Sequence, residues 1–201
     1  MELMLNFYGE MLRMLRNRLY DFVKDICKYN NFTHEKTEEI QYIMRVLMYE
    51  ILKIIIIITV FSIFGYMKEI ILIMFTLACV RPFTGGYHEY SHKRCLIATM
   101  TLAYFIILIS KNSNLNNIST ILLNIVNIFS IYHQSPIINT YMPITKENLI
   151  RRNKTIAVLN SIILSIISVI IIRYGIYSNI ITWTLTMNVC LMFNLRESKE
   201  G

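Results

Sequence analysis

Charged residues are scarce in this chain of 201 residues, because Asp, Glu, Lys and Arg together make up only 16% of it. Hydrophobic residues make up 55%, the mean hydropathy is +0.47, and the apolar residues gather in long runs. This composition is typical of a membrane protein. It leaves no room for a soluble domain of ordinary size, so we expect one integral membrane domain over residues 1–201.

Two further features are missing from the sequence. No C-x-x-C pair occurs among the four cysteines, and their spacing is not that of a disulfide framework. No signal peptide is expected, because the first long apolar run follows about fifty residues that include many charges. Cys79 and Cys190 lie inside apolar runs, where we expect inert core residues, whereas Cys95 has polar and cationic neighbours.

Short charged or Asn-rich breaks separate the apolar runs, and a helix that crosses a bilayer needs about 20 residues. The sequence therefore predicts an all-α integral membrane protein with about six hydrophobic helical segments, of which four to six span the membrane. The run over 70–80 is short, so it either borrows residues from Ile63 onward or enters the membrane without crossing it. The runs are 51–67, 70–80, 96–110, 118–134, 155–172 and 176–195.

The segment 1–32 carries apolar residues at helical spacing, which predicts an amphipathic helix at the membrane interface. Alternatively, the apolar stripe packs against the protein's own spans. Thr33 is a suitable N-cap, with Glu35 in the first turn, for a second helix that continues into the membrane. Lys53 is expected to reach from that helix to the membrane surface. The stripe comprises Leu3, Phe7, Met11, Met14, Leu19, Phe22 and Ile26.

Basic residues alternate between successive connections, so the net charge of +7 indicates membrane topology and no nucleic-acid partner is expected. Residues 1–50 hold seven Lys or Arg, 81–95 hold three and 135–154 hold four, whereas each opposite connection holds one. The positive-inside rule then places both termini, the segment 81–95 and the basic loop 135–154 in the cytosol.

One polar stretch, His88-Glu89-Tyr90-Ser91-His92, fits the H-E-x-x-H pattern of zinc proteases. In that pattern two histidines one helical turn apart hold zinc, and the glutamate activates water. A catalytic zinc site needs a third protein ligand, which is hard to find, because the two aspartates, Asp21 and Asp25, are N-terminal. His133 and Cys95 remain candidates, although His133 is better interpreted as a structural histidine at the interface.

Cys95 gives the same stretch a second interpretation, because the charges of Lys93 and Arg94 favour its thiolate form. A cysteine nucleophile with a histidine base is then conceivable. In one straight helix His88 shares a face with Cys95 but lies about 10.5 Å from it along the axis, so direct contact requires a bend. His92 is closer, at the i, i+3 relation. Local geometry therefore leaves both histidines open.

Gly85 and Gly86 allow backbone angles closed to other residues, which lets a substrate carbonyl approach or the next segment turn; a plain membrane turn is the alternative. The run Arg81-Pro82-Phe83-Thr84-Gly85-Gly86-Tyr87-His88, with Cys95 after six more residues and apolar runs on both sides, resembles the accessory gene regulator B family. These proteins are membrane cysteine endopeptidases that mature quorum-sensing peptides. The resemblance implies that His88 and Cys95 are the catalytic pair, with Arg81 and Gly86 in the motif, and that no metal or cofactor takes part.

The resemblance also implies a substrate, a short propeptide with an amphipathic N-terminal helix, an internal Cys or Ser, and an acidic C-terminal tail. Cys95 would release the tail and form a thioester, which a side chain of the peptide would displace to give a cyclic thiolactone or lactone. Arg151, Arg152 and Lys154 can attract the tail, or can serve only to orient the protein. The implied location is a bacterial cytoplasmic membrane, and a homodimer is allowed.

A non-enzymatic membrane protein, such as a transport component or an assembly factor, is the competing class. It would place polar or charged residues along a pathway at mid-membrane. The candidates for such a pathway are few: Lys53, Asn124, Asn127 and Asn188. The asparagines can instead join helices by hydrogen bonds. The enzyme is therefore the preferred interpretation.

Overall fold

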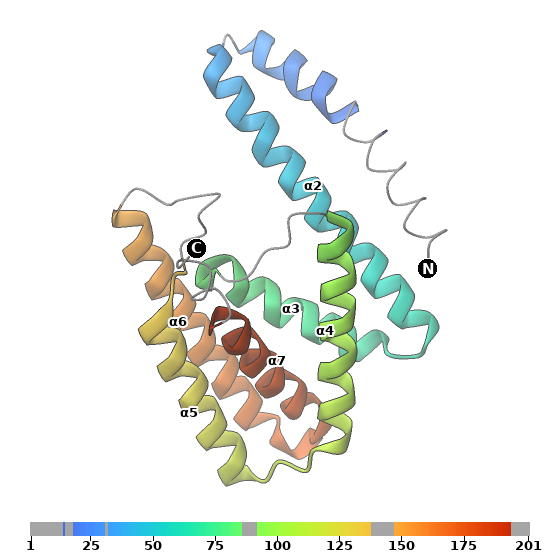
Figure 1. The fold of residues 1–201 in the computed structure, drawn as a ribbon, viewed down its shortest axis with the longest axis vertical. Helices are drawn as coiled ribbons and strands as arrows, with labels where there is room; N and C mark the ends of the chain where they lie inside the picture. Colours follow the sequence, from blue (N-terminus) through green and yellow to red (C-terminus); the bar gives the residue numbers. More distant parts are fainter. Residues whose placement is uncertain (1–13, 15–17, 31, 86–91, 138–146, 194–201) are drawn as a thin grey trace, which may run out of the picture.

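The computed structural model describes residues 14, 18–30, 32–85, 92–137 and 147–193, and nearly all of this part of the chain is helical (Figure 1). A helical stretch over 18–29 precedes the long helices. The elements that follow are α2 (His34–Ile63), α3 (Met67–Thr84), α4 (His92–Asn112), α5 (Asn117–Gln134), α6 (Glu147–Ile170), the 3-10 helix η1 (Ile172–Tyr174) and α7 (Ile176–Phe193).

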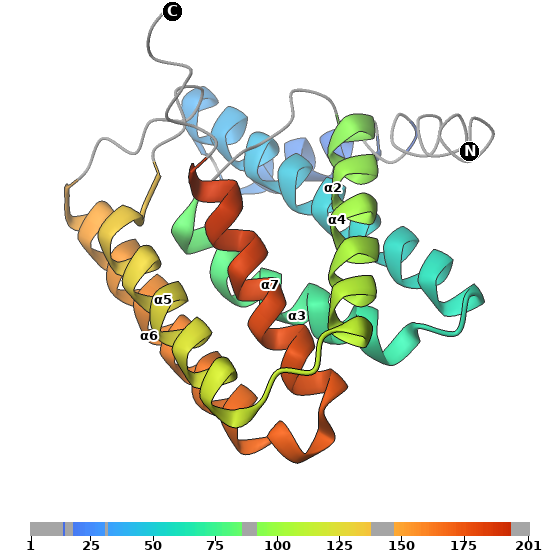
Figure 2. The same cartoon turned by 60° about the horizontal axis from the view of Figure 1, so that its bottom comes forward.

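Helix α7 lies in the middle of the bundle, between α4 on one side and α5 with α6 on the other (Figure 2). The apolar core has two parts. In one, α7 meets α2, α3 and α4, and in the other it meets α3, α5 and α6. Because α3 contributes to both parts, the position of its C-terminal end is fixed by the whole bundle.

Within the described residues, four helices are long and apolar enough to cross a membrane, namely α2, α4, α6 and α7. This confirms the prediction of an all-α, multi-pass membrane protein with at least four spans. Large apolar side chains such as Ile51, Leu122 and Ile170 are exposed on the outside of the bundle, as expected for a surface that faces lipid. Helices α3 and α5 are each 18 residues long and do not count among the four.

The short apolar run over 70–80 takes only part of the segment after Ile63, because α3 begins at Met67. Helix α2 ends at Ile63, and a turn with Gly65 at φ 80° separates it from α3. A positive φ favours glycine, which explains why the chain breaks there. Instead α3 gains residues at both of its ends, from Met67 and through Thr84. Thr33 is the N-cap residue of α2, as predicted, although its side chain makes no capping hydrogen bond.

The connections between helices gather at two opposite ends of the bundle. At one end the Nζ atom of Lys111 lies 4.1 Å from the centre of the Tyr66 ring, and Asn179 donates a hydrogen bond to the carbonyl of Ser113. At the other end the backbone N–H of Ile137 donates to the carbonyl of Thr84. The segments after α3 and after α5 therefore meet, and they lie on the same side of the protein, as the alternation of basic residues predicts.

Which end faces the cytosol can be measured by labelling single cysteines with an impermeant thiol reagent, in a variant that lacks the four native cysteines. We expect Asn114→Cys and Tyr174→Cys to be labelled from outside intact cells, because both positions are exposed at the end that is poor in basic residues. Glu147→Cys, at the basic end, should be labelled only after permeabilisation. Labelling of Glu147→Cys in intact cells would reverse the orientation.

Buried asparagines join α7 to its neighbours, which confirms the predicted alternative to a polar pathway. Asn127 of α5 donates to Thr186 over 3.0 Å, and Asn124 donates to Thr182 over 3.4 Å. Asn188 of α7 donates to the hydroxyl of Thr84 at the end of α3 over 3.3 Å. These hydrogen bonds satisfy polar groups that lipid cannot satisfy.

The helical stretch over 18–29 runs beside α2 (Figure 1). Val23 and Cys27 are buried, whereas Phe22 is 60% exposed and Ile26 is 43% exposed. One face thus packs on the protein, and the face with Phe22 and Ile26 remains open to an interface. The exposed stripe members therefore do not pack against the spans, and their place at a membrane interface stays a prediction. The members before Met14 lie outside the described residues.

Both segments that the sequence presents as cytosolic connections are partly helical. Arg81 and Thr84 belong to the end of α3, and Cys95 belongs to the start of α4. In the same way α6 begins at Glu147, so the basic residues predicted on a loop lie on its first turns. Acidic Glu147 in the first turn and the good helix propensity of Arg and Lys extend α6 beyond its apolar run.

Candidate active site

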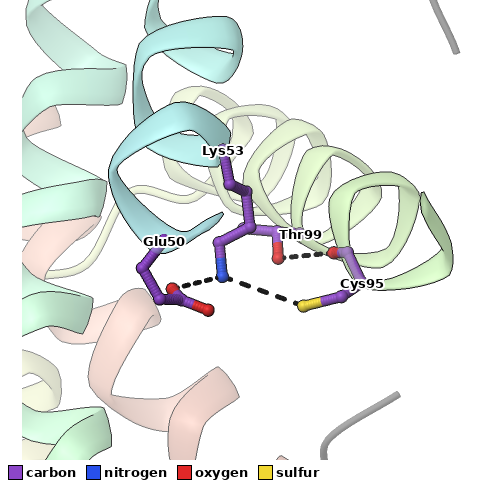
Figure 3. A network of polar contacts seen from close by, with 4 residues as sticks. All are labelled: Glu50, Lys53, Cys95 and Thr99. Carbon is purple, nitrogen blue, oxygen red and sulfur yellow. Dashed lines mark hydrogen bonds and ion pairs between the residues drawn. The ribbon is translucent and has the colours of Figure 1, made fainter. Parts of the chain in front are cut away.

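Cys95 lies in the first turn of α4, is half-buried, and faces α2 (Figure 3). The Nζ atom of Lys53 lies 3.8 Å from its Sγ atom. The same ammonium group is 2.5 Å from a carboxylate oxygen of Glu50, one turn earlier on α2. Thr99 donates a hydrogen bond to the carbonyl of Cys95 over 2.8 Å, one turn further along α4. The thiol therefore has a cation as its direct neighbour.

The side chain of Lys53 points toward Glu50 and Cys95 and not outward from α2, so the direction predicted for it is wrong. Its side chain is only 11% exposed, whereas that of Glu50 is 47% exposed. The long side chain turns inward because the Glu50 carboxylate and the Cys95 thiol lie there, and lipid provides no such partners. Lys93 and Arg94, which the sequence nominates as the cations beside Cys95, are both exposed.

Arg81 supplies a second positive charge near Cys95. It projects from the last turn of α3 and interacts electrostatically with Cys95 and with Glu50. Arg81 and Cys95 also line the same cavity, which agrees with their place in one sequence motif. Three helices thus contribute to one charged site, with Glu50 and Lys53 from α2, Arg81 from α3 and Cys95 from α4.

The cavity beside Cys95 has a volume of about 330 Å³ and continues along α4. Its α4 residues recur at helical spacing over ten positions, which corresponds to about 15 Å. Away from Arg81 and Cys95 its walls are mostly apolar, apart from two threonines. The residues that line it are Arg81, Cys95, Ala98, Thr99, Thr101, Leu102, Phe105 and Leu191.

His92 is the histidine that the structure places near Cys95, one turn before it on α4. Its ring packs against the ring of Tyr49, with centroids 4.0 Å apart. His88, Glu89 and Gly86 lie outside the described residues, so the predicted pair of His88 with Cys95 stays a prediction. The same holds for the zinc alternative, although no group of three metal-binding side chains occurs within the described part of the chain.

Gly85 adopts backbone angles closed to other residues, as the sequence suggests, and it has a structural role that the sequence does not show. Its φ is 68° and its ψ is −158°, a region of backbone angles that is nearly reserved for glycine. It forms a parallel bridge with Ile137, and a Cβ atom at this position would overlap the carbonyl oxygen of Ile137. Gly85 therefore allows the chain after α5 to approach the end of α3 closely.

The three basic residues of α6 lie away from Cys95. The first turns of α6 and of α4 are on opposite sides of the bundle, with α3 and α7 between them (Figures 1 and 2). Arg151 and Arg152 are exposed, whereas the Nζ atom of Lys154 lies 4.6 Å from the centre of the Tyr132 ring. His133 packs on Phe129, with centroids 4.3 Å apart, which fits a structural role.

The other cysteines do not share these surroundings. Cys27 is buried, Cys79 is half-buried and Cys190 is exposed on α7, so the expected core position of Cys190 is wrong. Cys190 is exposed because it lies near the C-terminal end of α7, on the side of this helix that faces out of the bundle. Cys95 alone combines partial exposure, a contact with a lysine and a cavity.

Sequence reasoning missed Lys53 and Glu50 as members of the site. One signal was present, because a lysine within an apolar run is costly in a membrane and is therefore a functional candidate by default. The sequence does not show where such a side chain points, and Lys53 precedes Cys95 by 42 positions.

These features define a multi-pass helical membrane protein with a thiol site at one end of its bundle. Residues 19–193 match the family described as AgrB, accessory gene regulator B. A protein of Clostridium perfringens (strain 13 / Type A) that is described as AgrB-like is 38% identical over 187 residues, which cover 93% of this chain and 100% of that protein. No solved structure matches the chain. The chain belongs to the AgrB family, and membership implies an AgrB-like role in peptide processing.

The close approach at Gly85 predicts a larger loss of stability for Gly85→Ala than for Gly65→Ala. Both positions have a positive φ, but a Cβ at Gly65 meets nothing within 4 Å. The strained backbone costs about 1–3 kcal/mol at either position, and the overlap with Ile137 adds to it only at Gly85. Thermal unfolding in detergent measures both variants. Equal melting temperatures of the two variants would show that the contact with Ile137 does not contribute to stability.

Proposed function

We propose that this protein is a membrane cysteine endopeptidase that removes the C-terminal tail of a short propeptide, with Cys95 as nucleophile and His88 as general base. The observation that carries the proposal is the half-buried thiol of Cys95, which has a lysine at 3.8 Å and a mostly apolar cavity beside it, in a chain of the AgrB family. A thiolate is the reactive form of cysteine, and neighbouring cations favour it.

The proposed reaction has two steps, and the first one cleaves the peptide. The Cys95 thiolate attacks the carbonyl carbon of the bond before the tail, so that an S–C bond forms and an oxyanion develops. The oxyanion collapses, the C–N bond breaks, and protonated His88 gives its proton to the departing amine. The tail leaves with a new amino terminus, and the rest of the peptide stays on Cys95 as a thioester.

In the second step a thiol or hydroxyl within the bound peptide attacks the thioester. His88 takes the proton of this nucleophile, the bond to Sγ breaks, and Cys95 leaves again as a thiolate. The product is a cyclic thiolactone or lactone that is still joined to its leader. Water must be kept from the thioester, and the apolar walls of the cavity suit this need.

The cavity accommodates an apolar side chain of the peptide next to the bond that is cleaved. It begins at Cys95 and continues along α4 between residues such as Leu102 and Phe105. Its volume of about 330 Å³ is at the small end of the usual range for ligand pockets. The site therefore fits a short segment of an amphipathic peptide better than a folded protein.

An acidic tail of the substrate meets a favourable field at this end of the bundle. Arg151, Arg152 and Lys154 lie on α6, across the bundle from Cys95, so they attract the tail over a distance and do not hold the reacting bond. In the proposed orientation this end faces the cytosol of a bacterium, where the propeptide is made.

The nucleophile and the base are tested by trapping the covalent adduct of Cys95 with a synthetic propeptide, in detergent or vesicles, by mass spectrometry. Cys95→Ala should form no adduct. His88→Ala should slow cleavage by about 10²-fold to 10⁴-fold, the usual worth of a positioned acid or base. His92→Ala, which loses its packing on Tyr49, should be mild. A dead His92→Ala beside an active His88→Ala would assign the base to His92.

The same assay separates the thiol mechanism from the zinc alternative. Strong chelators should leave adduct formation and cleavage unchanged, because the proposed reaction uses no metal. Cleavage that is lost on chelation and restored by zinc would favour the alternative with His88, Glu89 and His92.

The role of the cavity is tested by filling it from α4. Ala98 lines the cavity and Ile97 does not, although both side chains are exposed on neighbouring positions of the same helix. We expect Ala98→Phe to slow cleavage of the propeptide by about tenfold or more, and Ile97→Phe to change it little. Alkylation of Cys95 by iodoacetamide should proceed in both variants. Equal cleavage by the two variants would exclude the cavity from substrate binding.

A further inference from the structure

Helix α2 carries an ionisable pair, Glu50 and Lys53, inside a segment that is otherwise apolar enough to cross a membrane. Ionisable side chains in such a segment are unfavourable and usually mark a functional site. An ion pair alone does not explain the position of this lysine, because its ammonium group also contacts the Sγ atom of Cys95. The contact joins α2 to the nucleophile of the proposed reaction.

Three charged groups surround Cys95. Lys53 and Arg81 bring two positive charges, and Glu50 brings one negative charge, so these three groups sum to +1. A thiolate at Cys95 would carry a charge of the opposite sign to this sum, and opposite charges attract strongly in a poorly hydrated site.

Other titratable groups near the cluster add little to its charge. Tyr49 of α2 and His92 of α4 pack on each other, and both are uncharged when His92 is neutral. Lys93 and Arg94 are exposed to solvent at the start of α4, where their charges are screened. Within the described part of the chain, Lys53 is the cation for which a direct contact with the Cys95 sulfur is recorded.

We propose that Lys53 is a further catalytic residue, whose ammonium group stabilises the Cys95 thiolate and which Glu50 holds in position. Its importance for peptide cleavage rests on the proposed function, but its effect on Cys95 does not. The thiolate appears twice in that function, first as the attacking group and then as the leaving group of the thioester, so Lys53 assists both steps.

The role of Lys53 differs from that of a general base. A lysine that is paired with a carboxylate is protonated, and an ammonium group has three donors and no lone pair to take a proton. Lys53 therefore stabilises charge and moves no proton. Proton transfer remains the task of a histidine, and the two roles can be measured separately.

The experiment is the rate of Cys95 alkylation by iodoacetamide as a function of pH, on the full chain in detergent, with Cys27, Cys79 and Cys190 replaced by Ala. No peptide is needed. Lys53→Met keeps the length of the side chain and removes its charge. We expect it to slow alkylation at pH 7 by about tenfold or more, because the reactive thiolate loses its neighbouring cation.

Two variants serve as controls on charge and on position. Lys53→Arg keeps the positive charge, so its alkylation rate should stay within about threefold of the parent. Lys68→Met removes an exposed lysine from the opposite end of the bundle and should match the parent. A Lys53→Met profile that coincides with the parent profile would overturn the proposal, as would a Lys53→Arg profile as slow as that of Lys53→Met.

A double variant guards against an indirect effect of Lys53→Met, which leaves Glu50 without its partner. Glu50→Gln combined with Lys53→Met removes both charges, and we expect alkylation to remain about threefold or more slower than in the parent. If the double variant matches the parent, the unpaired carboxylate caused the effect and the proposal fails. Normal elution on size exclusion shows for each variant that the fold is kept.

Cleavage of the propeptide by the same variants separates the two proposals. If Lys53→Met slows alkylation and cleavage together, both proposals are supported. Should alkylation slow while even the parent fails to cleave any propeptide, the peptidase function is wrong and the pairing of Lys53 with Cys95 stands. If alkylation is unchanged while the parent cleaves, only the role of Lys53 is lost.

Discussion

The fold depends on one constraint, which is that the polar side chains of α7 must find their hydrogen-bond partners inside the bundle because lipid offers none. Ser168 of α6 contacts the hydroxyl of Thr182 at 2.8 Å, and Asn127 of α5 donates to Thr186. Asn179 and Asn188 reach the ends of α4 and α3. A helix with acceptors and donors on several sides can satisfy them only at the centre, so α7 lies there and fixes the helices around it.

The site follows from this arrangement. The hydrogen bond from α7 holds Thr84 at the end of α3, and Gly85 then lets the segment after α5 pack closely against that end. Arg81, one turn earlier, is thereby held next to the start of α4 and to Cys95. Helix α2 crosses the same place and adds Glu50 and Lys53. Charged groups concentrate where three apolar helices meet. There Lys53 pairs with Glu50, and the Cys95 thiol lies beside the cations.

Much of this was predictable from the sequence, since long apolar runs and the alternation of basic residues respond to the bilayer itself. The multi-pass helical fold, the N-cap at Thr33 and the location of the segments after α3 and α5 on one side of the protein were all expected. The helix ends were not, because hydropathy locates the lipid-embedded part of a helix and α3 and α6 continue beyond it into polar residues. The direction predicted for the Lys53 side chain was also wrong. A long charged side chain reaches toward water only where no polar partner lies closer, and here Glu50 and Cys95 do.

What the sequence determined by itself is therefore the class of protein, and it nominated Cys95 as the candidate nucleophile. Composition places the chain in a membrane, and the short motif from Arg81 to Cys95 relates it to the AgrB family, because both are local properties of the chain. Only the tertiary structure decided which charges surround the sulfur. Lys53 and Cys95 are 42 positions apart, and their contact depends on the rotation of α2 against α4. That rotation results from packing across the whole bundle, which no periodicity within a single helix encodes.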